Sequence, residues 1–474
     1  MQHTETDYLI IGSGATGMAF ADTLVQETQG SDTHITIVDR HAKPGGHWND
    51  AYPFVTLHQP SACYGVNSMN FGTNCKDTIG PNQGMYELAS GPEVSSYYDK
   101  VMNQKLLASG RVSYHPMSNY LEDCKFESIL SGTQTQVKVR KKLVDANFYG
   151  PTVPSTHTPK FKVAHGVRLV TPNALAQLWQ VQEKADRPTK FCILGAGKTA
   201  MDAGIWLLNN GASPESISWV MPRDSWLINR ITTQAGAEFF NHAIGGQAAL
   251  MTCLANATSI DDLFLRIEAS NQMLRIYPDH KPSMFHFATI SKGEIAILQR
   301  IKNVIRMGRV QALEPQAMVL EGGRVAMEPG TLYIDCTASG VEPKAMQPIF
   351  QSNKIVLQMV RAGQPTFSAA VIAYVEAHYP DDESDEAKNK LCGNVPFPHT
   401  PADYPRTIIA NMMNQAQWKQ DKRLRNWMHE TRLDGFGKLM TNIDASDTEK
   451  MAIMGNLRTQ AMAAMANMPK LLAR

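Results

Sequence analysis

The sequence lacks several features that would point to whole classes of protein. Its 474 residues carry 45 Lys and Arg against 44 Asp and Glu, and a formal net charge of +1 gives no bulk attraction to nucleic acid or to an anionic membrane. No uninterrupted apolar run reaches the roughly 18 residues that a membrane-spanning helix needs. The N-terminus has no charged segment followed by an apolar one. We therefore expect no secretory signal and a cytoplasmic protein.

Cysteine is scarce and widely spaced. No pair forms a C-x-x-C motif and no cluster has the spacing of metal ligands, so we expect reduced thiols and no metal site. Two cysteines twelve positions apart, Cys63 and Cys75, also lack the close spacing of the redox pair in flavin-dependent disulfide reductases. The seven cysteines are at positions 63, 75, 124, 192, 253, 336 and 392.

Two glycine fingerprints are present, and each follows a short apolar run and opens a helix-compatible one. The first is Gly12-Ser13-Gly14-Ala15-Thr16-Gly17, and the second is Gly195-Ala196-Gly197-Lys198-Thr199-Ala200. In this context the glycines allow a tight turn and a close backbone approach to a pyrophosphate at a helix N-terminus. Two such sites are typical of proteins that hold two dinucleotides, most often FAD and NAD(P)H.

The pattern along the chain predicts an α/β protein with two Rossmann-like dinucleotide-binding domains. We expect a discontinuous FAD domain over residues 1–170 and 331–474, which ends in a helical C-terminal region. The NADPH domain is expected to be inserted over residues 171–330 and to carry a helical insertion at about 234–290. Methionines recur near helical spacing in the last helices, which is more typical of packing than of a docking surface.

An acid follows the first fingerprint at the end of the next predicted strand. Asp39 could accept both hydroxyls of an adenosine ribose, and its carboxylate would repel a 2′-phosphate. The site therefore suits FAD or NAD, with the adjacent Arg40 as a further candidate contact. The alternative is that Asp39 is a plain turn residue at a strand end.

The second fingerprint has no acid at the equivalent strand end. The strand ends at Arg223, where a guanidinium would offer a bidentate fork to a 2′-phosphate, and Arg230 could join it. This pattern favours NADPH over NADH, although two arginines at this place could also be ordinary surface residues. Lys198 and Thr199 open the helix and are candidate pyrophosphate contacts, or in the case of Thr199 a helix cap.

The residues Gly45-Gly46-His47-Trp48 come soon after Asp39. With the two fingerprints and a late strand and turn ending in A-x-G, they make the chain resemble the flavin-containing monooxygenase-like superfamily over most of its length. The resemblance implies that Gly46, His47 and Trp48 wrap the FAD, although Trp48 could also be a buried anchor. It also implies that the late turn meets the flavin ribityl and pyrophosphate, which makes Asp335, Ala338 and Ser339 candidate contacts.

The resemblance further implies that the loop after Trp48 passes near the isoalloxazine ring. His58 and Gln59 on this loop are therefore candidate catalytic donors, against the alternative of a structural histidine. The family fingerprint F-x-G-x-x-x-H is not intact at residues 161–167, and Asp145-Ala146-Asn147 replaces the expected A-T-G. The chain is therefore a divergent member.

The function implied is that of an FAD-dependent, NADPH-using monooxygenase. Hydride would pass from NADPH to the flavin, and a C4a-(hydro)peroxyflavin formed with O₂ would oxygenate a small organic substrate. The broken fingerprint keeps open a flavin-dependent NAD(P)H oxidase or reductase without oxygen insertion. A non-catalytic dinucleotide-binding redox partner is a third hypothesis. Neither the substrate nor the oligomeric state is readable from the sequence.

Overall fold

The computed structural model describes residues 1–181, 188–379, 384–441 and 443–473. Its N-terminal part is built on an eight-stranded sheet with the main order β19-β20-β6-β1-β2-β3, counted over these residues. Strands β20, β6, β1, β2 and β3 run parallel, while β4 and β5 form a hairpin that pairs with β6. The bounds are β1 (Gln2–Ile11), β2 (Ile35–Val38), β3 (Val112–His115), β4 (Ser118–Leu121), β5 (Lys125–Ser128), β6 (Gln134–Asp145), β19 (Phe350–Gln351) and β20 (Lys354–Val356).

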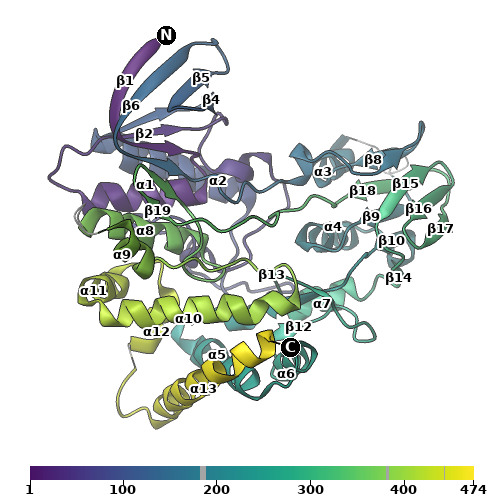
Figure 1. Cartoon of the computed structure of the whole chain (residues 1–474). Helices are drawn as coiled ribbons and strands as arrows, with labels where there is room; N and C mark the ends of the chain where they lie inside the picture. Colours follow the sequence, from purple (N-terminus) through teal and green to yellow (C-terminus); the bar gives the residue numbers. More distant parts are fainter. Residues whose placement is uncertain (182–187, 380–383, 442, 474) are drawn as a thin grey trace.

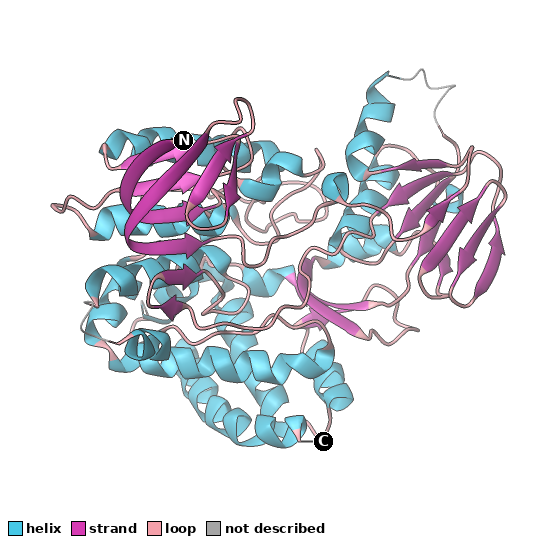
Figure 2. Ribbon diagram, turned by 45° about the horizontal axis from the view of Figure 1, so that its top comes forward, coloured by secondary structure: helices cyan, strands magenta, loops and turns pink. Residues whose placement is uncertain are grey.

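A second sheet lies apart from the first, on the other side of the molecule (Figure 2). It has five parallel strands in the order β14-β10-β9-β18-β8. Strands β9 and β18 are buried along their whole length, as expected for parallel strands covered on both faces. The bounds are β8 (Arg168–Val170), β9 (Phe191–Leu194), β10 (Ile217–Val220), β14 (Asn303–Ile305) and β18 (Leu332–Asp335).

The boundaries between the two units differ from those expected from the sequence. Strand β8 ends at Val170 and strand β18 begins at Leu332, yet both belong to the second sheet. A division at 170 and 331 therefore gives two strands of the second sheet to the first unit. The sequence could not reveal this, because β8 and β18 pair with each other over more than a hundred intervening residues.

Helices cover both sheets. Helices α1 and α8 pack against each other on the first sheet, and α4 packs against α7 on the second. Helix α8 is buried over most of its length, so it is a core helix of the first unit. The bounds are α1 (Ala15–Glu27), α2 (Gly91–Val101), α3 (Pro172–Val181), α4 (Lys198–Asn209), α7 (Lys292–Leu298), α8 (Pro365–His378) and α9 (Asp385–Leu391).

A helical layer lies under the two units (Figure 1), and the helical insertion and C-terminal helices expected from the sequence form it together. Helix α13 packs along α5, although about 190 residues separate them in the chain. Within the described residues, no helix is long and apolar enough to span a bilayer. The bounds are α5 (Phe240–Asn256), α6 (Ile260–Ala269), α10 (Tyr404–Gln420), α11 (Lys422–Glu430), α12 (Gly435–Thr441) and α13 (Thr448–Leu472).

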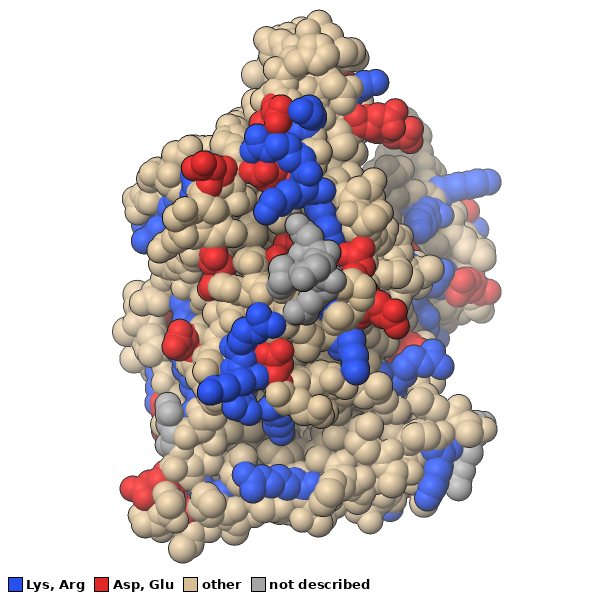
Figure 3. Space-filling view, turned by 60° about the vertical axis from the view of Figure 1, so that its left-hand side comes forward, with Lys and Arg blue, Asp and Glu red and all other residues tan. Residues whose placement is uncertain are grey.

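Two small sheets complete the second half. One has the order β12-β11-β13 and joins the insertion to the second unit, and the other has the order β17-β16-β15-β7. Figure 3 shows acidic and basic side chains interspersed on one face of the molecule, in line with the balanced net charge. The bounds are β7 (Lys162–Val163), β11 (Ser225–Asn229), β12 (Met273–Leu274), β13 (Met284–Ile290), β15 (Val310–Glu314), β16 (Ala317–Leu320) and β17 (Gly323–Ala326).

Candidate functional site

A single cavity of about 2190 Å³ is lined by residues from both glycine fingerprints. This volume is more than twice the upper end of the range for a site that holds one drug-sized ligand, about 1,000 Å³. The sequence-predicted residues that line it are Gly12, Gly14, Ala15, Thr16, Asp39, Arg40, Gly46, His47, Trp48, His58, Gln59, Gly195, Gly197, Lys198, Thr199, Arg223, Ala338 and Ser339. Gly17, Ala200, Arg230 and Asp335 do not line it.

The first fingerprint forms the turn between β1 and α1. A side chain is excluded or tolerated at each of its three glycines for a different steric reason. Gly12 has a φ of 102°, and a Cβ there would lie 2.6 Å from Oδ1 of Asn147. A Cβ on Gly14 would meet nothing closer than the Cα of Gly46 at 3.7 Å, so its cavity side is open. Gly17 lies inside, where a Cβ would meet the carbonyl oxygen of Gly12 at 2.0 Å. This is the division of roles that a dinucleotide turn requires.

Asp39 lies directly after β2 and is almost completely buried. Its Oδ2 accepts hydrogen bonds from the backbone N–H of Ser13 at 2.6 Å and from the Ser13 hydroxyl at 2.9 Å. Its Oδ1 accepts from the backbone N–H of His41 at 2.8 Å and from Nδ1 of the same residue at 2.9 Å. Against the effect of burial, these bonds lower the pKa of Asp39, so the group is a carboxylate at neutral pH.

The Gly45-Gly46 turn packs backbone to backbone against the first fingerprint. Both glycines have positive φ, and a Cβ on Gly46 would lie 2.9 Å from the Cα of Gly14. His47 stacks on Trp48 at 5.2 Å between ring centroids, and Trp48 Nε1 donates to the Tyr64 hydroxyl at 2.9 Å. Burial lowers the pKa of His47 to about 4, so its imidazole is neutral at neutral pH. Trp48 is thus both anchored and part of the cavity wall.

The second fingerprint repeats the turn between β9 and α4. Gly195 has a φ of 114°, and a Cβ there would lie 2.6 Å from the carbonyl oxygen of Cys336. Gly197 has no atom within 4 Å of a built Cβ, so it faces open space in the cavity. Ala200 takes the place of the third glycine and is buried in the helix. The amides at the start of α4, at Lys198 and Thr199, therefore face the cavity.

A chain of buried charges runs from the start of α4 to the insertion. The ammonium group of Lys198 is paired with Asp202 and lies 3.9 Å from Oε1 of Glu294. Asp202 also accepts a hydrogen bond from the Tyr52 hydroxyl at 2.8 Å. Burial works to raise the pKa of Glu294, but Lys198 and Arg230 lower it overall. Lys198 is therefore neutralised by the protein itself.

Arg230 does not lie where the sequence analysis expected it. Its side chain is fully buried, ion-paired with Glu294 at 2.8 Å, and donates to the backbone carbonyl of His58 at 2.7 Å. It cannot reach a phosphate in the cavity from this position. Its position could not be predicted from its place seven residues after Arg223. Strand β11, which separates the two arginines, belongs to the β12-β11-β13 sheet and not to the sheet that contains β10.

Arg223 lies three residues beyond the end of β10, is exposed, and lines the cavity. Arg309 lies four residues beyond the end of β14, the parallel strand that pairs with β10. Burial and the charge of Arg309 lower the pKa of Arg223, against the opposite effect of Glu321. Lys160 and Lys162 line the same end. Sequence reasoning missed Arg309, because 86 positions separate the two arginines. The two arginines come close because β14, which precedes Arg309, pairs with β10.

The loop with His58 and Gln59 lines the cavity between the two units. His58 is open to the cavity but surrounded by protein, and this environment and the charges of Lys198 and Arg230 lower its pKa. Its imidazole is therefore neutral at neutral pH. Gln59 donates from Nε2 to the carbonyl oxygen of Cys63 at 3.3 Å, which fixes its amide.

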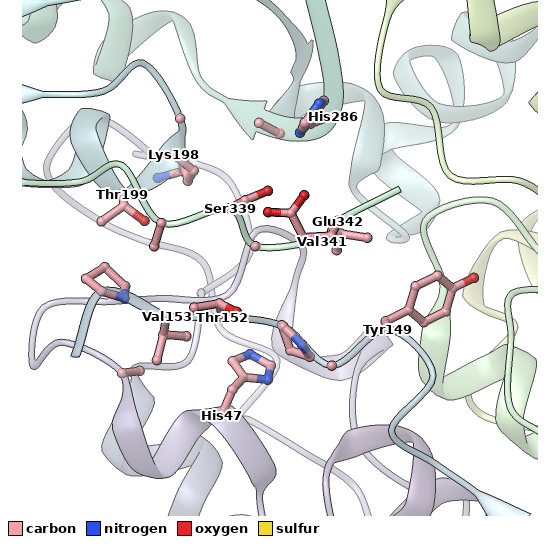
Figure 4. A pocket seen from close by; sticks show the side chains of 18 of the residues that line it. His47, Tyr149, Thr152, Val153, Lys198, Thr199, His286, Ser339, Val341 and Glu342 are labelled. Atoms are coloured by element: carbon pink, nitrogen blue, oxygen red, sulfur yellow. The ribbon is translucent and has the colours of Figure 1, made fainter. Parts of the chain in front are cut away.

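The late turn adjoins the second fingerprint rather than the first. It follows β18 of the second sheet, and Asp335 is buried, with Oδ1 accepting from the backbone N–H and the hydroxyl of Thr337. Ala338 and Ser339 do line the cavity, on a segment that crosses it between His47 and Lys198 (Figure 4). The expectation that this turn belongs to the flavin half is thus corrected by the pairing of β18 with β9.

In the first unit, the segment that leads into α8 lines the cavity, as the turn after β18 does in the second unit. It was not predicted from the sequence. Residues 362–365 line the cavity, and the last of them, Pro365, is the first residue of the helix. The side-chain oxygen Oε1 of Gln364 is buried without a hydrogen-bond partner. A helix N-terminus at a cavity wall is suited to a polar ligand. Gly363 followed by Pro365 was the available signal.

Comparison with known proteins gives a family and a fold. Residues 10–70 match the model of a NAD(P)-binding Rossmann-like domain. The chain is 44% identical over 436 residues to the uncharacterized proteins Rv2000 of Mycobacterium tuberculosis and Mb2023 of Mycobacterium bovis, which covers 92% of this chain and 79% of theirs.

Among solved structures, a polycyclic ketone monooxygenase from Thermothelomyces thermophila aligns with a TM-score of 0.50 at 11% identity, over 98% of this chain and 88% of that one. A closed form of cyclohexanone monooxygenase aligns with a TM-score of 0.48 at 11% identity, over 98% and 99% of the two chains. The alignment with the polycyclic ketone monooxygenase confirms the predicted resemblance at the level of the fold. The chain belongs to one family with the mycobacterial protein Rv2000, and its fold is similar to that of the polycyclic ketone monooxygenase.

Proposed function

We propose that this protein is an FAD-containing, NADPH-using oxidoreductase that acts as a monooxygenase on a small organic substrate. The observation that carries the proposal is that two dinucleotide turns open onto one cavity. The turn of the first unit is followed by a carboxylate, Asp39, and that of the second by a guanidinium, Arg223. The two sites are thus matched to two different dinucleotides in one space.

The first site supports FAD. Gly12 and Gly14 leave an open cradle at the start of α1, and Gly46 brings the next turn into backbone contact with it. All four acceptor positions of the Asp39 carboxylate are already used. A ribose hydroxyl would therefore replace a side-chain donor, Ser13 Oγ or His41 Nδ1, while the backbone donors stay.

The second site supports NADPH. Arg223 and Arg309 are exposed guanidinium groups, and neither is in an ion pair among the described residues, although the carboxylate of Glu321, which accepts from the backbone N–H of Arg309 at 2.8 Å, acts on Arg223 from nearby. Two such groups suit a 2′-phosphate, which accepts bidentate, charge-assisted hydrogen bonds. The open side of Gly197 and the amides at the start of α4 would hold the pyrophosphate. Lys198 adds little net charge there because Asp202 and Glu294 neutralise it.

When bound, FAD supplies the hydride acceptor and the site of oxygen activation. The residues of the chain position the two cofactors, exclude water from the cavity and hold neutral donors near the reacting centre. A neutral His58 can donate a hydrogen bond without adding charge, and Arg230 holds its loop through the backbone carbonyl. All seven cysteines, each within the described residues, are free thiols, which supports a reducing, cytoplasmic setting.

The test begins with the purified protein and added FAD. We expect a yellow protein that oxidises NADPH faster than NADH and transfers one atom of ¹⁸O₂ to thioanisole as a general sulfide probe. Stoichiometric H₂O₂ with no labelled sulfoxide would instead support the oxidase or reductase, which the broken F-x-G-x-x-x-H fingerprint favours. A protein that stays colourless with excess FAD contradicts both enzyme functions and leaves the non-catalytic partner.

A further inference from the structure

Strand β13 contains an irregularity where it faces the cavity. It pairs with β11 in a register that joins Phe285 to Trp226 and Thr289 to Ile228. Residues 286–288 therefore stand opposite the single residue Leu227. Phe287, at the centre of this bulge, has a φ of 55°, which is the left-handed region. A bulky aromatic residue rarely adopts this backbone conformation, and such outliers cluster at functional sites.

The bulge changes which side chains reach the cavity. In a regular strand, successive side chains point to opposite faces, so at most every second residue would line one cavity. Here the three consecutive residues His286, Phe287 and Ala288 all line it. The backbone strain thus brings three neighbouring residues to the same cavity, and the ring of His286 points into it (Figure 4).

Aromatic and apolar side chains surround these rings. Phe397 lies edge-on to Phe287 at 5.5 Å and to His286 at 5.9 Å between ring centroids. Tyr404 and Ile408 of α10 and Ile228 of β11 line the same cavity. Helix α10 and strand β13 thus meet here, which is where the C-terminal helices join the insertion. Ring edges and aliphatic groups favour a flat apolar ligand.

His286 supplies a polar group to this wall. His286 Nε2 lies 3.1 Å from the carbonyl oxygen of His399, which can only accept, so Nε2 carries the hydrogen. Nδ1 is therefore the acceptor of a neutral ring. Burial and the neighbouring His399 and Arg223 lower the pKa of His286, which keeps it neutral. Figure 4 shows the ring projecting into the cavity above Ser339 and Glu342.

We propose that the bulge of β13 forms the substrate subsite, and that the substrate is an uncharged aromatic molecule with a hydroxyl or ring N–H. Phe287 and Phe397 hold the aromatic ring, and His286 Nδ1 accepts the hydrogen bond. The substrate class rests on the proposed function, since a monooxygenase needs a third ligand beside its two cofactors. The binding itself does not depend on turnover.

Calorimetric titration of the FAD-loaded protein with three probes tests the subsite. Indole carries a ring N–H, 1-methylindole lacks it, and indole-3-acetate adds a negative charge. We expect indole to bind at least tenfold more tightly than either of the others, because an unmet acceptor or a buried charge costs affinity. Equal binding of indole and 1-methylindole, or tighter binding of indole-3-acetate, would overturn the proposed substrate class.

Two variants test the assigned residues. Phe287→Gly removes the ring but suits the left-handed backbone, so the fold should be kept while the Kd for indole rises at least tenfold. His286→Ala should bring the Kd values of indole and 1-methylindole within twofold of each other. As a matched control, Phe161→Ala removes a ring from the cavity wall beside β7 and should leave the indole Kd within twofold.

The same variants separate this proposal from the proposed function. If Phe287→Gly binds indole normally but raises the KM for NADPH, the bulge contacts the nicotinamide cofactor and the subsite proposal is wrong. If NADPH is not oxidised at all, the proposed function fails, and the titration still decides whether the bulge binds an aromatic molecule. Thermal unfolding of each variant checks that the comparison is made between folded proteins.

Discussion

At the scale of single residues, position along a strand decided which charges face the cavity. Asp39 lies directly after the second strand of its βαβ unit and Arg223 lies three residues after the second strand of the other, so both reach the carboxyl edge of a parallel sheet. Arg230 is also a cation near this edge, yet it is buried against Glu294. Arg223 is exposed, so its guanidinium can bind a ligand in the cavity. The guanidinium of Arg230 is buried and already bonded to Glu294 and to the carbonyl of His58, so its role is structural.

Replacement of either exposed arginine tests the 2′-phosphate assignment. Arg223→Ala and Arg309→Ala should each raise the KM for NADPH roughly 10- to 100-fold, because a charge-assisted hydrogen bond contributes about 1.5–3 kcal/mol. The KM for NADH should change less than threefold. Steady-state kinetics with both nucleotides measure this. An equal loss with NADPH and NADH would show that the arginines are structural.

The neutral imidazole of His47 predicts a pH dependence of stability. Its pKa of about 4 in the folded state lies below the unfolded value of about 6.5, so the unfolded chain binds the proton first as pH falls. Stability should therefore decrease from pH 6.5 toward pH 4, and by pH 5 this residue contributes up to about 2 kcal/mol of the loss. Urea unfolding without FAD at pH 7 and pH 5 measures it.

His47→Gln is the matching variant, since an amide does not titrate in this range. Its stability should fall less between pH 7 and pH 5 than that of the unsubstituted protein. A fall of the same size in both proteins would mean that His47 takes up a proton while folded, and that its environment does not hold it neutral.

At the scale of elements, the C-terminal helix completes the core of the insertion. Met468 of α13 is fully buried with Leu254 and Phe264 of the insertion, whereas Met462 on the same helix is 70% exposed. Some methionines of α13 are therefore packed in the core, and others are exposed to solvent. The sequence did not reveal which face of α13 is buried, because its partner helix, α5, lies about 190 residues away in the chain.

This division predicts unequal effects of one substitution. Met468→Ala should lower the free energy of unfolding by about 2–5 kcal/mol, since it leaves a cavity in a packed core. Met462→Ala should change it by less than about 0.5 kcal/mol. Chemical denaturation of both variants gives the comparison. If Met462→Ala were the more destabilising change, the exposed side of α13 would have to be covered by something else.

At the scale of the whole molecule, the local patterns were predictable and the long-range pairings were not. Each βαβ unit lies within about 30 residues, so strand, glycine turn and helix could be recognised together. Arg309, the start of α8 and the membership of β18 depend on pairing between distant segments. The bulge at Phe287 depends on its register with β11. Such features carry no local signal, and they supply much of the cavity wall.

Ligand linkage tests the two-cofactor arrangement as a whole. A cofactor that binds the folded protein at 100 times its Kd stabilises it by about 2.7 kcal/mol. We expect FAD to raise the melting temperature by several degrees and NADPH to raise it further. Asp39→Ala should weaken the response to FAD and keep the response to NADPH. Purification of Asp39→Ala with full flavin content would contradict the role assigned to this acid.

The contact between Arg230 and the carbonyl of His58 has a consequence for protein engineering. The guanidinium comes from the insertion side of the second unit, and the loop that it holds belongs to the first. A chimera that exchanges the nucleotide-binding half for that of a relative would therefore have to transplant Arg230 together with Glu294. A graft that kept only one of the two would bury an unpaired charge at the seam between the halves.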